Sequence, residues 1–260
     1  MDLDEYRRMA NVEQTHWWYR STRSLLRQLI ESALQDVEYS APRRLLDAGC
    51  GTGATGAWMA ELGNVIALDS QPEALTLYSE LHPKAELLAG DIADIKLPDN
   101  YVDVVLCVTV LYHAEVTEPQ QAVLEMARIT APGGLVCLME PGVRRLRRGH
   151  DRVTHAARRF SRRELELLAT NSGLEIIRST GAYSFLIPPA WLKARIEREK
   201  SLSDLDNNSS GLFGLLGFIA KCEHLLLRSL SLPFGLSVLV IARKKPQAEN
   251  HPKSHDREVR

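Results

Sequence analysis

A short apolar run that passes straight into three alternating glycines is the feature of this sequence that most constrains the fold. Residues 45–53 read Leu-Leu-Asp-Ala-Gly-Cys-Gly-Thr-Gly. We expect a buried strand over 44–48, a loop over the glycines and a helix over 55–62. Glycine has no Cβ, so the backbone of such a loop turns sharply and lies directly against a ligand. The segment therefore predicts a loop that cradles a nucleotide-like cofactor.

The alternation of strand-like and helix-like segments continues along the chain. Residues 65–68 predict a second strand and residues 72–81 a second helix, which completes a strand–helix–strand unit. Because right-handed crossovers place helices on each side of such strands, we expect a parallel sheet covered on both faces, and hence an α/β fold. The next predicted elements are strands at 85–88, 102–108 and 135–139 and a helix at 119–129.

The regular alternation ends after residue 141. Ser161 and Glu164 have the spacing of a capping box and predict a helix to residue 170, which Gly173 ends. Two further strands are predicted, separated by a helical, partly apolar insertion with a polar hinge. The strands are at 174–177 and 236–242, the insertion at about 188–232 and the hinge at 201–210. A charged tail over 244–260 is typical of disorder.

Composition excludes several classes of protein. With 45% hydrophobic and 25% charged residues, the chain is an ordinary globular protein. Lys and Arg number 32 against 33 Asp and Glu, so no overall positive field favours nucleic acid as a partner. A charged N-terminus and apolar runs too short to span a bilayer predict a cytoplasmic protein. The widely spaced cysteines predict buried, reduced thiols and no metal site; they are Cys50, Cys107, Cys137 and Cys222.

Two acidic residues fall where the second and third predicted strands end. Asp69 can accept hydrogen bonds from both hydroxyls of a ribose, and Asp91 from an adenine amino group. Their alternative role is to cap the helices that follow. The carboxyl ends of parallel strands meet at one edge, so both acids are expected beside the glycine loop. Residues 51–56 also match the GxGxxG fingerprint of dinucleotide-binding domains, which leaves a nicotinamide cofactor open.

The ordered set of motifs favours a different cofactor. Asp47 precedes the first glycine, residues 101–105 open the fourth strand with Tyr-Val-Asp-Val-Val, and an Ala-Pro-Gly-Gly turn at 131–134 precedes the fifth. Together with Asp91 these motifs resemble the class I S-adenosylmethionine-dependent methyltransferases, in particular the group called methyltransferase type 11. The resemblance covers about residues 45–140. It implies a Rossmann-like, seven-stranded, mostly parallel sheet and S-adenosylmethionine as the cofactor.

The resemblance also implies which residues contact that cofactor. The glycine loop corresponds to the methionine contact, the acid after the second strand to the ribose contact and the acid after the third strand to the adenine contact. The end of the fourth strand is a further contact region. The implied cofactor-binding residues are Asp47, Gly49, Cys50, Gly51, Gly53, Asp69, Ser70, Asp91, Ile92, Cys107 and Val108.

His113, after the fourth strand, is the candidate catalytic base. Methyl transfer from a sulfonium is an in-line displacement, so alignment of the reactants supplies much of the rate. A base is needed only where an acceptor hydroxyl must lose its proton, and a histidine titrates in the right range. The alternative role of His113 is to cap the next segment or to pack against the cofactor loop.

Three segments are candidates for acceptor contact. Residues 16–23 combine aromatic and basic side chains that either cover the cofactor or anchor the core. Residues 144–163 contain nine arginines and one acid, which suit a phosphate or carboxylate, or else form a solvated face. Residues 211–232 either pack within the domain, cover an apolar pocket or rest on a membrane surface. The candidate acceptor residues are Tyr19, Arg20, His150, His155, Arg158 and Arg159.

We therefore predict an N-terminal helical lid over 1–40, a class I methyltransferase domain over 41–243 and a disordered tail. The expected function is methyl transfer from S-adenosylmethionine to a small-molecule or lipid- or glycan-linked acceptor, at oxygen. Peripheral membrane contact through 211–232 is a further expectation. The alternatives are an NAD(P)-dependent oxidoreductase and a non-catalytic cofactor-binding module, and the sequence does not specify the oligomeric state.

Overall fold

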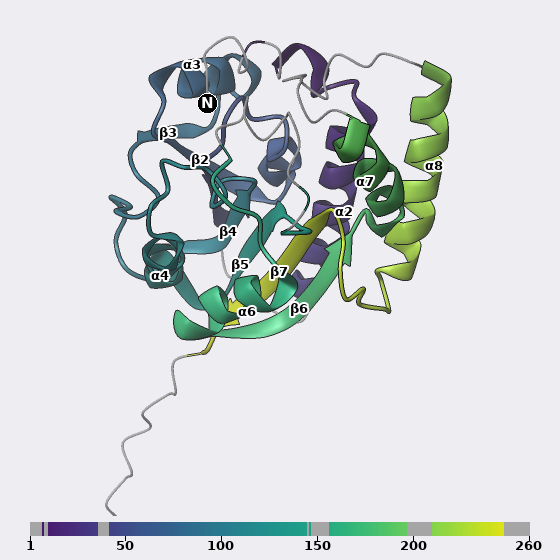
Figure 1. Cartoon of the computed structure of the whole chain (residues 1–260). Helices are drawn as coiled ribbons and strands as arrows, with labels where there is room; N and C mark the ends of the chain where they lie inside the picture. Colours follow the sequence, from purple (N-terminus) through teal and green to yellow (C-terminus); the bar gives the residue numbers. More distant parts are fainter. Residues whose placement is uncertain are drawn as a thin grey trace, which may run out of the picture.

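The computed structural model describes residues 7, 10–35, 42–144, 146, 156–196 and 210–246. Seven strands form one sheet in the order β3-β2-β1-β4-β5-β7-β6 (Figure 1). The strands are β1 (Arg43–Ala48), β2 (Gly63–Asp69), β3 (Glu86–Ala89), β4 (Val102–Val108), β5 (Thr130–Pro141), β6 (Leu174–Ala182) and β7 (Ser237–Lys244). The first five strands pair in parallel, whereas β7 runs antiparallel to both β5 and β6. The predicted Rossmann-like, mostly parallel sheet is confirmed.

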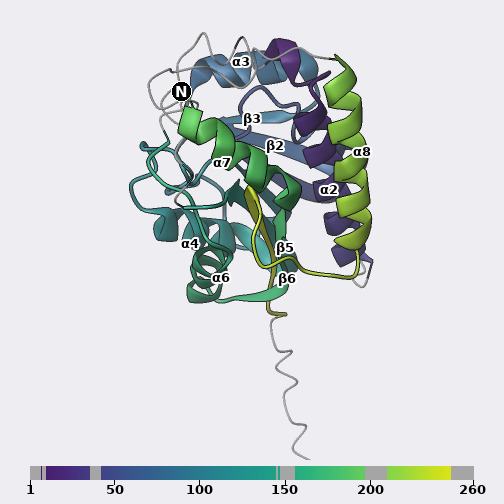
Figure 2. The same cartoon turned by 45° about the vertical axis from the view of Figure 1, so that its right-hand side comes forward.

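Helices cover both faces of this sheet (Figures 1 and 2). The side chains of β1 alternate between the two faces: Leu45 belongs to one buried apolar cluster and Leu46 to the other. Met126 from α4 and Leu165 from α6 pack in the cluster of Leu46, and Leu26 from α2 in that of Leu45. The helices of the described chain are α2 (Trp17–Leu34), α3 (Pro72–Leu81), α4 (Pro119–Ile129), α6 (Arg162–Asn171), α7 (Ile187–Ile196) and α8 (Ser210–Leu226).

The predicted helix over 55–62 is wrong. The chain forms only a short 3-10 helix, η1 (Ala57–Glu61), after a run of turns. No side chain caps its N-terminus at Gly56, and Gly53 holds a left-handed φ of +92° that an α-helix does not allow. The glycine loop therefore extends further along the chain than the apolar pattern indicated.

The predicted capping box is confirmed. Ser161 Oγ accepts a hydrogen bond from the backbone N–H of Glu164 at 3.2 Å, and the backbone N–H of Ser161 donates to Glu164 Oε2 at 2.8 Å. These contacts satisfy donors that the first turn of α6 leaves without helical partners. Beyond the helix, Gly173 adopts the left-handed φ of +79° that commonly ends helices.

The helical insertion contains α7 and α8, and α8 lies beside α2 (Figure 2). The contact between the two helices is polar as well as apolar, since Gln28 Nε2 donates to the backbone oxygen of His224 at 3.2 Å. The buried carboxylate of Glu223 accepts hydrogen bonds from the backbone N–H groups of Tyr183 and Ser184, at 2.5 and 2.8 Å. These contacts attach the insertion to the end of β6. Most of the predicted hinge, residues 201–209, lies outside the described residues.

Three of the four cysteine thiols are buried as predicted, but Cys222 is exposed on α8. Position 222 lies on the outer side of that helix, away from the buried Ala220 and Glu223. Of the predicted disordered tail, 244–260, residues 247–260 lie outside the described residues. The prediction is wrong at Lys244, which ends β7 and donates to the backbone oxygen of Ala127 at 2.8 Å. None of the described helices has the length and apolar character to cross a membrane.

Candidate functional site

The carboxyl ends of the parallel strands bring the predicted cofactor residues to one edge of the sheet. The glycine loop follows β1, Asp69 ends β2, the segment of Asp91 follows β3, and His113 lies in the loop after β4. In open α/β sheets ligands bind at this edge, because the loops there diverge and leave backbone groups accessible. This edge is therefore the candidate site.

The glycine loop has a backbone conformation that other residues rarely adopt. Gly49, Gly51 and Gly53 have φ angles of +72°, +53° and +92°. Two of these positions also lack room for a side chain. A Cβ at residue 49 would collide with the side chain of Val110, and a Cβ at residue 53 would come within 2.6 Å of the Tyr78 ring. Both conformation and space therefore require glycine in this loop.

Asp69 holds the glycine loop against the end of β2. Its Oδ2 accepts a hydrogen bond from the backbone N–H of Gly51 at 2.9 Å, and its Oδ1 accepts one from Gln71 at 2.9 Å. Burial raises the pKa of the Asp69 carboxyl, while the hydrogen bonds from Gln71 and Gly51 oppose that rise. Asp69 is thus positioned by the backbone, and Ser70 beside it is exposed.

Asp47 is the least compensated polar group of this edge. Its carboxyl is almost fully buried beneath the loop, and its Oδ2 has no hydrogen-bond partner among the described residues. Burial, and then the nearby charge of Asp69, raise the pKa of Asp47 to about 8. A buried carboxyl oxygen without a donor is unfavourable by itself. The pair of acids therefore suits a ligand that brings a positive charge or hydrogen-bond donors.

Asp91 follows β3 on the exposed surface of the edge. Its Oδ1 accepts a hydrogen bond from the backbone N–H of Ala93 at 2.8 Å, so the carboxylate caps its own turn, while the side chain of Ile92 is buried. The predicted alternative role of a strand-end Asp, capping, therefore applies to one oxygen of Asp91.

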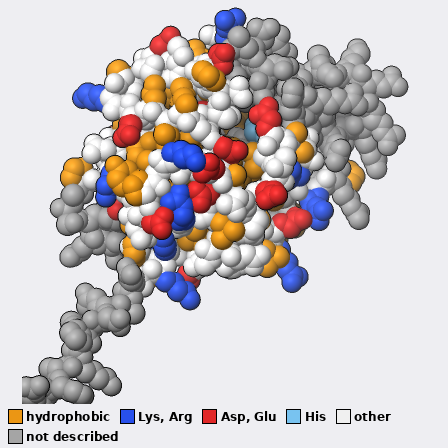
Figure 3. Space-filling view, turned by 90° about the vertical axis from the view of Figure 1, so that its left-hand side faces the viewer, with side chains coloured by type: hydrophobic (Ala, Val, Ile, Leu, Met, Phe, Trp, Pro, Cys, Tyr) orange, Lys and Arg blue, Asp and Glu red, His pale blue; other side chains and the backbone are white. Residues whose placement is uncertain are grey.

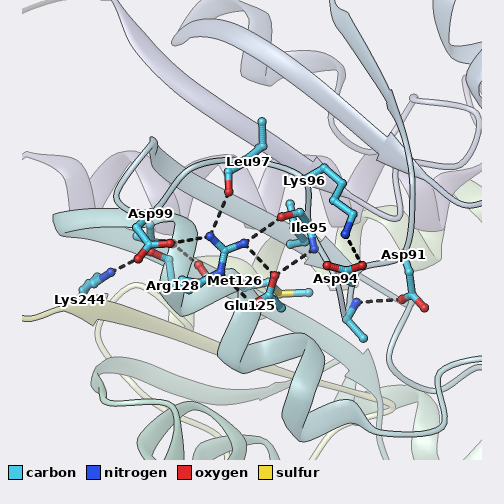
Figure 4. A network of polar contacts seen from close by, with 12 residues as sticks. Asp91, Asp94, Ile95, Lys96, Leu97, Asp99, Glu125, Met126, Arg128 and Lys244 are labelled. Atoms are coloured by element: carbon cyan, nitrogen blue, oxygen red, sulfur yellow. Dashed lines mark hydrogen bonds and ion pairs between the residues drawn. The ribbon is translucent and has the colours of Figure 1, made fainter.

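Arg128, near the end of α4, fixes the segment that follows Asp91 (Figure 4). Its guanidinium donates to the backbone oxygens of Ile95 and Leu97 at 2.8 and 3.0 Å. It also pairs with Asp99 and with Glu125, and these two acids raise the pKa of Arg128. One guanidinium thus holds two backbone positions of the chain between β3 and β4.

Glu140 supports the loop after β4. Its side chain is completely buried at the end of β5, and its Oε1 accepts hydrogen bonds from the backbone N–H groups of Val110 and Leu111 at 3.1 and 2.9 Å. Burial raises the pKa of Glu140 to about 8, although the backbone N–H groups and Arg158 lower it. The loop that Glu140 holds begins at Thr109, which has a left-handed φ of +54°, and continues to His113.

His113 lies between that loop and the segment before α6. Its backbone N–H donates to the oxygen of Val110 at 3.1 Å, and the residue forms a bridge with Ala156. The ring of His113 is half-buried and lies 4.1 Å from the ring of Tyr112, measured between centroids. Val108, at the end of β4, is also half-buried, whereas Cys107 is completely buried in the core.

The structure describes four of the six predicted acceptor residues; His150 and His155 lie outside the described residues. Tyr19 packs against the ring of Trp18 in the first turn of α2, and Arg20 is exposed. Arg159 donates to the backbone oxygen of Gly142 at 3.1 Å, and the charge of Arg158 acts on Glu140. The arginines are therefore near the end of β5, at the same edge as the glycine loop.

Glu13 and Glu140 also lie at this edge, and no sequence motif predicted either of them. Each is a buried acid, with exposed fractions of 2% and 0%. For Glu140 a signal was present, because an acid that ends an apolar run at a strand terminus is unusual in a core. Glu13 offers no such local signal, because its contacts are with residues distant in sequence.

Among the described residues no group of His, Cys, Asp or Glu could hold a metal ion.

On the side of β3 and α4, acidic and basic side chains are interspersed (Figure 3). This mixture agrees with the near-zero net charge of the whole chain, -1 at pH 7. A surface for nucleic acid would instead gather positive charge on one face.

The fold and the site edge together define a class I, Rossmann-like cofactor-binding domain. Residues 46–138 match the family described as "Methyltransferase domain". An uncharacterized methyltransferase of Mycobacterium tuberculosis is 39% identical over 101 residues, which are 38% of this chain and 40% of that protein. A malonyl-[acyl-carrier protein] O-methyltransferase of Pectobacterium atrosepticum is 38% identical over 94 residues, 36% of each chain.

A solved structure of a SAM-dependent methyltransferase from Methanosarcina mazei has the same fold, with a TM-score of 0.54 and 19% identity. The superposition covers 84% of this chain and 98% of the Methanosarcina chain. This chain spans 40% of the length of the Mycobacterium relative and 36% of the length of the Pectobacterium relative. Residues 46–138 are therefore similar to a methyltransferase domain, and the cofactor that this similarity indicates is S-adenosylmethionine.

Proposed function

We propose that this protein transfers a methyl group from S-adenosylmethionine to an oxygen atom of a small-molecule or lipid- or glycan-linked acceptor. The buried carboxyl of Asp47, beside Asp69 and beneath the glycine loop, carries the proposal. S-adenosylmethionine carries an ammonium group and a sulfonium, and it supplies the methyl group when bound. A cation near Asp47 would favour the ionised carboxylate, which burial without a donor otherwise disfavours.

The residues along the edge fit the other parts of this cofactor. Gly49 and Gly53 leave the backbone of the loop open where a Cβ would stand. Asp69 and Ser70 are assigned to the ribose hydroxyls, and Asp91 and Ile92 to the adenine. The remaining assigned contacts are Cys50 and Gly51 in the loop and, at the end of β4, the half-buried Val108 and the backbone of Cys107.

The same edge disfavours the dinucleotide alternative. A pyrophosphate is anionic, and a nicotinamide cofactor would place it at the glycine loop. There the buried carboxyl of Asp47, directly beneath the loop, would repel it when ionised. Like charges brought together in a desolvated site are strongly unfavourable. This repulsion favours a cationic cofactor over NAD.

The chain's own contribution to the reaction is alignment and the handling of one proton. The glycine loop and the loop of Val110 hold the donor and the acceptor in contact, and their geometry supplies much of the rate. His113 is assigned as the base that takes the proton of an acceptor hydroxyl. The name of the Pectobacterium relative, an O-methyltransferase, supports oxygen as the acceptor atom.

An anionic acceptor is supported by the arginines near the end of β5. Guanidinium groups bind phosphate and carboxylate in a bidentate manner, and Arg158 and Arg159 lie near Gly142 and Glu140. Charge reversal at Arg158 should raise the KM for the acceptor and leave the affinity for the cofactor unchanged. An unchanged acceptor KM would count against this assignment.

A lipid-linked acceptor is supported by the outer face of α8. Leu215, Phe218 and Leu225 share this face at helical spacing, with exposed fractions of 56%, 65% and 59%. The exposed charged residues between 214 and 230 are Lys221 and Arg228, both positive. An apolar face with positive charges fits an anionic lipid surface.

Flotation with vesicles of phosphatidylglycerol and phosphatidylcholine tests this contact. The wild type should float with the anionic vesicles, and the double variant Phe218→Ser, Leu225→Ser should not. Leu167→Ser on α6, which replaces another exposed leucine, is the matched control and should float. A wild type that stays in the soluble fraction would exclude the membrane contact.

Calorimetric titration with S-adenosylmethionine, its demethylated product and NAD tests the proposed function. The wild type should bind the first two, and Asp47→Asn should bind them about tenfold more weakly, because the change removes the negative charge. Binding of NAD alone would support the oxidoreductase. Binding of S-adenosylmethionine without methyl transfer to any of a panel of hydroxyl and carboxyl acceptors would favour the non-catalytic module.

A further inference from the structure

The outer side of the glycine loop is covered by the segment that precedes α2. Glu13 lies in this segment and is only 2% exposed. Its Oε2 accepts a hydrogen bond from the Thr52 hydroxyl, with 2.6 Å between the oxygens. Thr52 stands between Gly51 and Gly53 and is itself buried. A residue far away in sequence thus contacts the centre of the loop.

Arg23, in the second turn of α2, strengthens the same junction. Its guanidinium donates from Nη1 to the backbone oxygen of Glu13 at 3.0 Å and to the backbone oxygen of Ala54 at 3.4 Å. The opposite charges of Arg23 and Glu13 also attract each other. One side chain therefore connects the N-terminal segment to the loop directly.

The contacts of the loop come from several elements of the fold. Asp69, at the end of β2, holds Gly51, and His82, at the end of α3, contacts the backbone oxygen of Gly53 at 3.1 Å. Between these positions Thr52 is held by Glu13, and Ala54 follows under Arg23. The segment before α2 and the helix α2 thus supply one contact each to the residues from 51 to 54.

Burial of the Glu13 carboxyl is unfavourable, so its contacts at this position must offset the loss of hydration. Desolvation raises the pKa of the Glu13 carboxyl to about 7, despite the contacts with Thr52 and Arg23. An apolar side chain would pack here without that cost. Glu13 and Arg23 also lie outside residues 46–138, which match the methyltransferase domain family.

We propose that Glu13 is a positioning residue: by holding Thr52, it fixes the glycine loop in the conformation that receives the cofactor. The inference rests on the proposed function. Binding of the cofactor and ordering of residues 10–16 are then coupled, and each favours the other by the same factor. The N-terminal segment is in this way a part of the cofactor site.

A double-mutant cycle tests the role of Glu13. The Kd of the demethylated cofactor product is measured by calorimetry for the wild type, Glu13→Ala, Thr52→Val and the double variant. We expect each single change to raise the Kd about tenfold. The Kd of the double variant should not exceed the larger of the two single-variant values, because both changes break the same contact. Additive losses would overturn the proposal, because the two residues would then act independently.

Two further variants separate positioning from folding. Glu13→Gln keeps an oxygen that accepts from Thr52, so it should restore binding to within about threefold of the wild type. Glu31→Ala removes an exposed carboxylate of α2 that pairs with Arg27, and should leave the Kd unchanged. Circular dichroism melts identify any variant that fails to fold, and Thr52→Val keeps the shape of the side chain it replaces.

Hydrogen exchange provides a second readout that a purely structural role would not affect. Addition of the product should slow exchange at residues 10–16 in the wild type but not in Thr52→Val. Wild-type affinity in both single variants, or exchange that does not respond to the product, would overturn the role of Glu13. A wild type that does not bind the product at all would instead overturn the proposed function.

Discussion

The carboxyl of Asp47 lies directly against the backbone of Gly56, where a Cβ would collide with Asp47 Oδ2. Gly56 is the last glycine of the segment that matches the dinucleotide fingerprint. In that fingerprint the third glycine allows a helix to pack closely on a strand. Here the local requirement is different, because the absent side chain makes room for a buried acid. The GxGxxG match therefore has a local cause that involves no dinucleotide.

Asp47→Asn should stabilise the cofactor-free protein while it weakens cofactor binding. Burial and the charge of Asp69 raise the pKa of Asp47 from 3.8 to about 8. Between pH about 4 and about 8, the carboxyl of Asp47 is therefore protonated in the native state and ionised in the unfolded state. The stability of the wild type therefore falls as the pH rises from about 4 to 8. We expect the variant to be more stable by at least about 1 kcal/mol at pH 8 and equally stable near pH 4. Urea unfolding at the two pH values measures the difference.

Gly53→Ala should cost more stability than Gly133→Ala, although both glycines have left-handed backbones. Their φ angles are +92° and +82°. A Cβ at residue 133 meets nothing within 4 Å, whereas one at residue 53 approaches the Tyr78 ring. Gly133→Ala should therefore lower the free energy of unfolding by about 1 kcal/mol, through backbone conformation alone. Gly53→Ala should lower it further, because the added Cβ also collides with the Tyr78 ring. Equal losses in chemical denaturation would show that the Tyr78 ring moves freely.

Glu140→Ala should destabilise the protein by about 2–4 kcal/mol. The change leaves the backbone N–H groups of Val110 and Leu111 without their buried acceptor. Glu140→Gln keeps the acceptor oxygen and should lose less. The pKa of Glu140 is raised from 4.5 to about 8, so the native state of the wild type loses stability as the pH rises through this window. The Gln variant should lack that part of the slope, and unfolding curves from pH 5 to 8 provide the comparison.

His113→Gln should lower kcat by about 100-fold or more without a change in the Kd of the cofactor. The loss follows if His113 takes a proton from the acceptor hydroxyl. Steady-state rates across pH 5.5 to 8.5, with the cofactor saturating, provide this test. A kcat within about threefold of the wild-type value would show that His113 is not the base, and that alignment of the reactants supplies the rate.

The elements of the parallel sheet followed from local patterns. Apolar runs bounded by turn residues predicted all seven strands, and Pro72 and Pro119 mark helix starts that the structure confirms. The glycine spacing predicted the loop, and the left-handed φ angles of Gly49, Gly51 and Gly53 confirm it. The predicted helix over 55–62 is replaced by the short 3-10 helix η1, whose N-terminus at Gly56 has no side-chain cap.

The sequence by itself determined the α/β class, the edge at which the loops meet and the acids Asp47, Asp69 and Asp91. It did so because strand period, turn chemistry and glycine are local properties of the chain. Only the tertiary structure decided that Glu13 contacts Thr52 and that Glu140 supports Val110. These pairs are distant in sequence, and the burial that raises the pKa of each acid arises only when separate elements pack together.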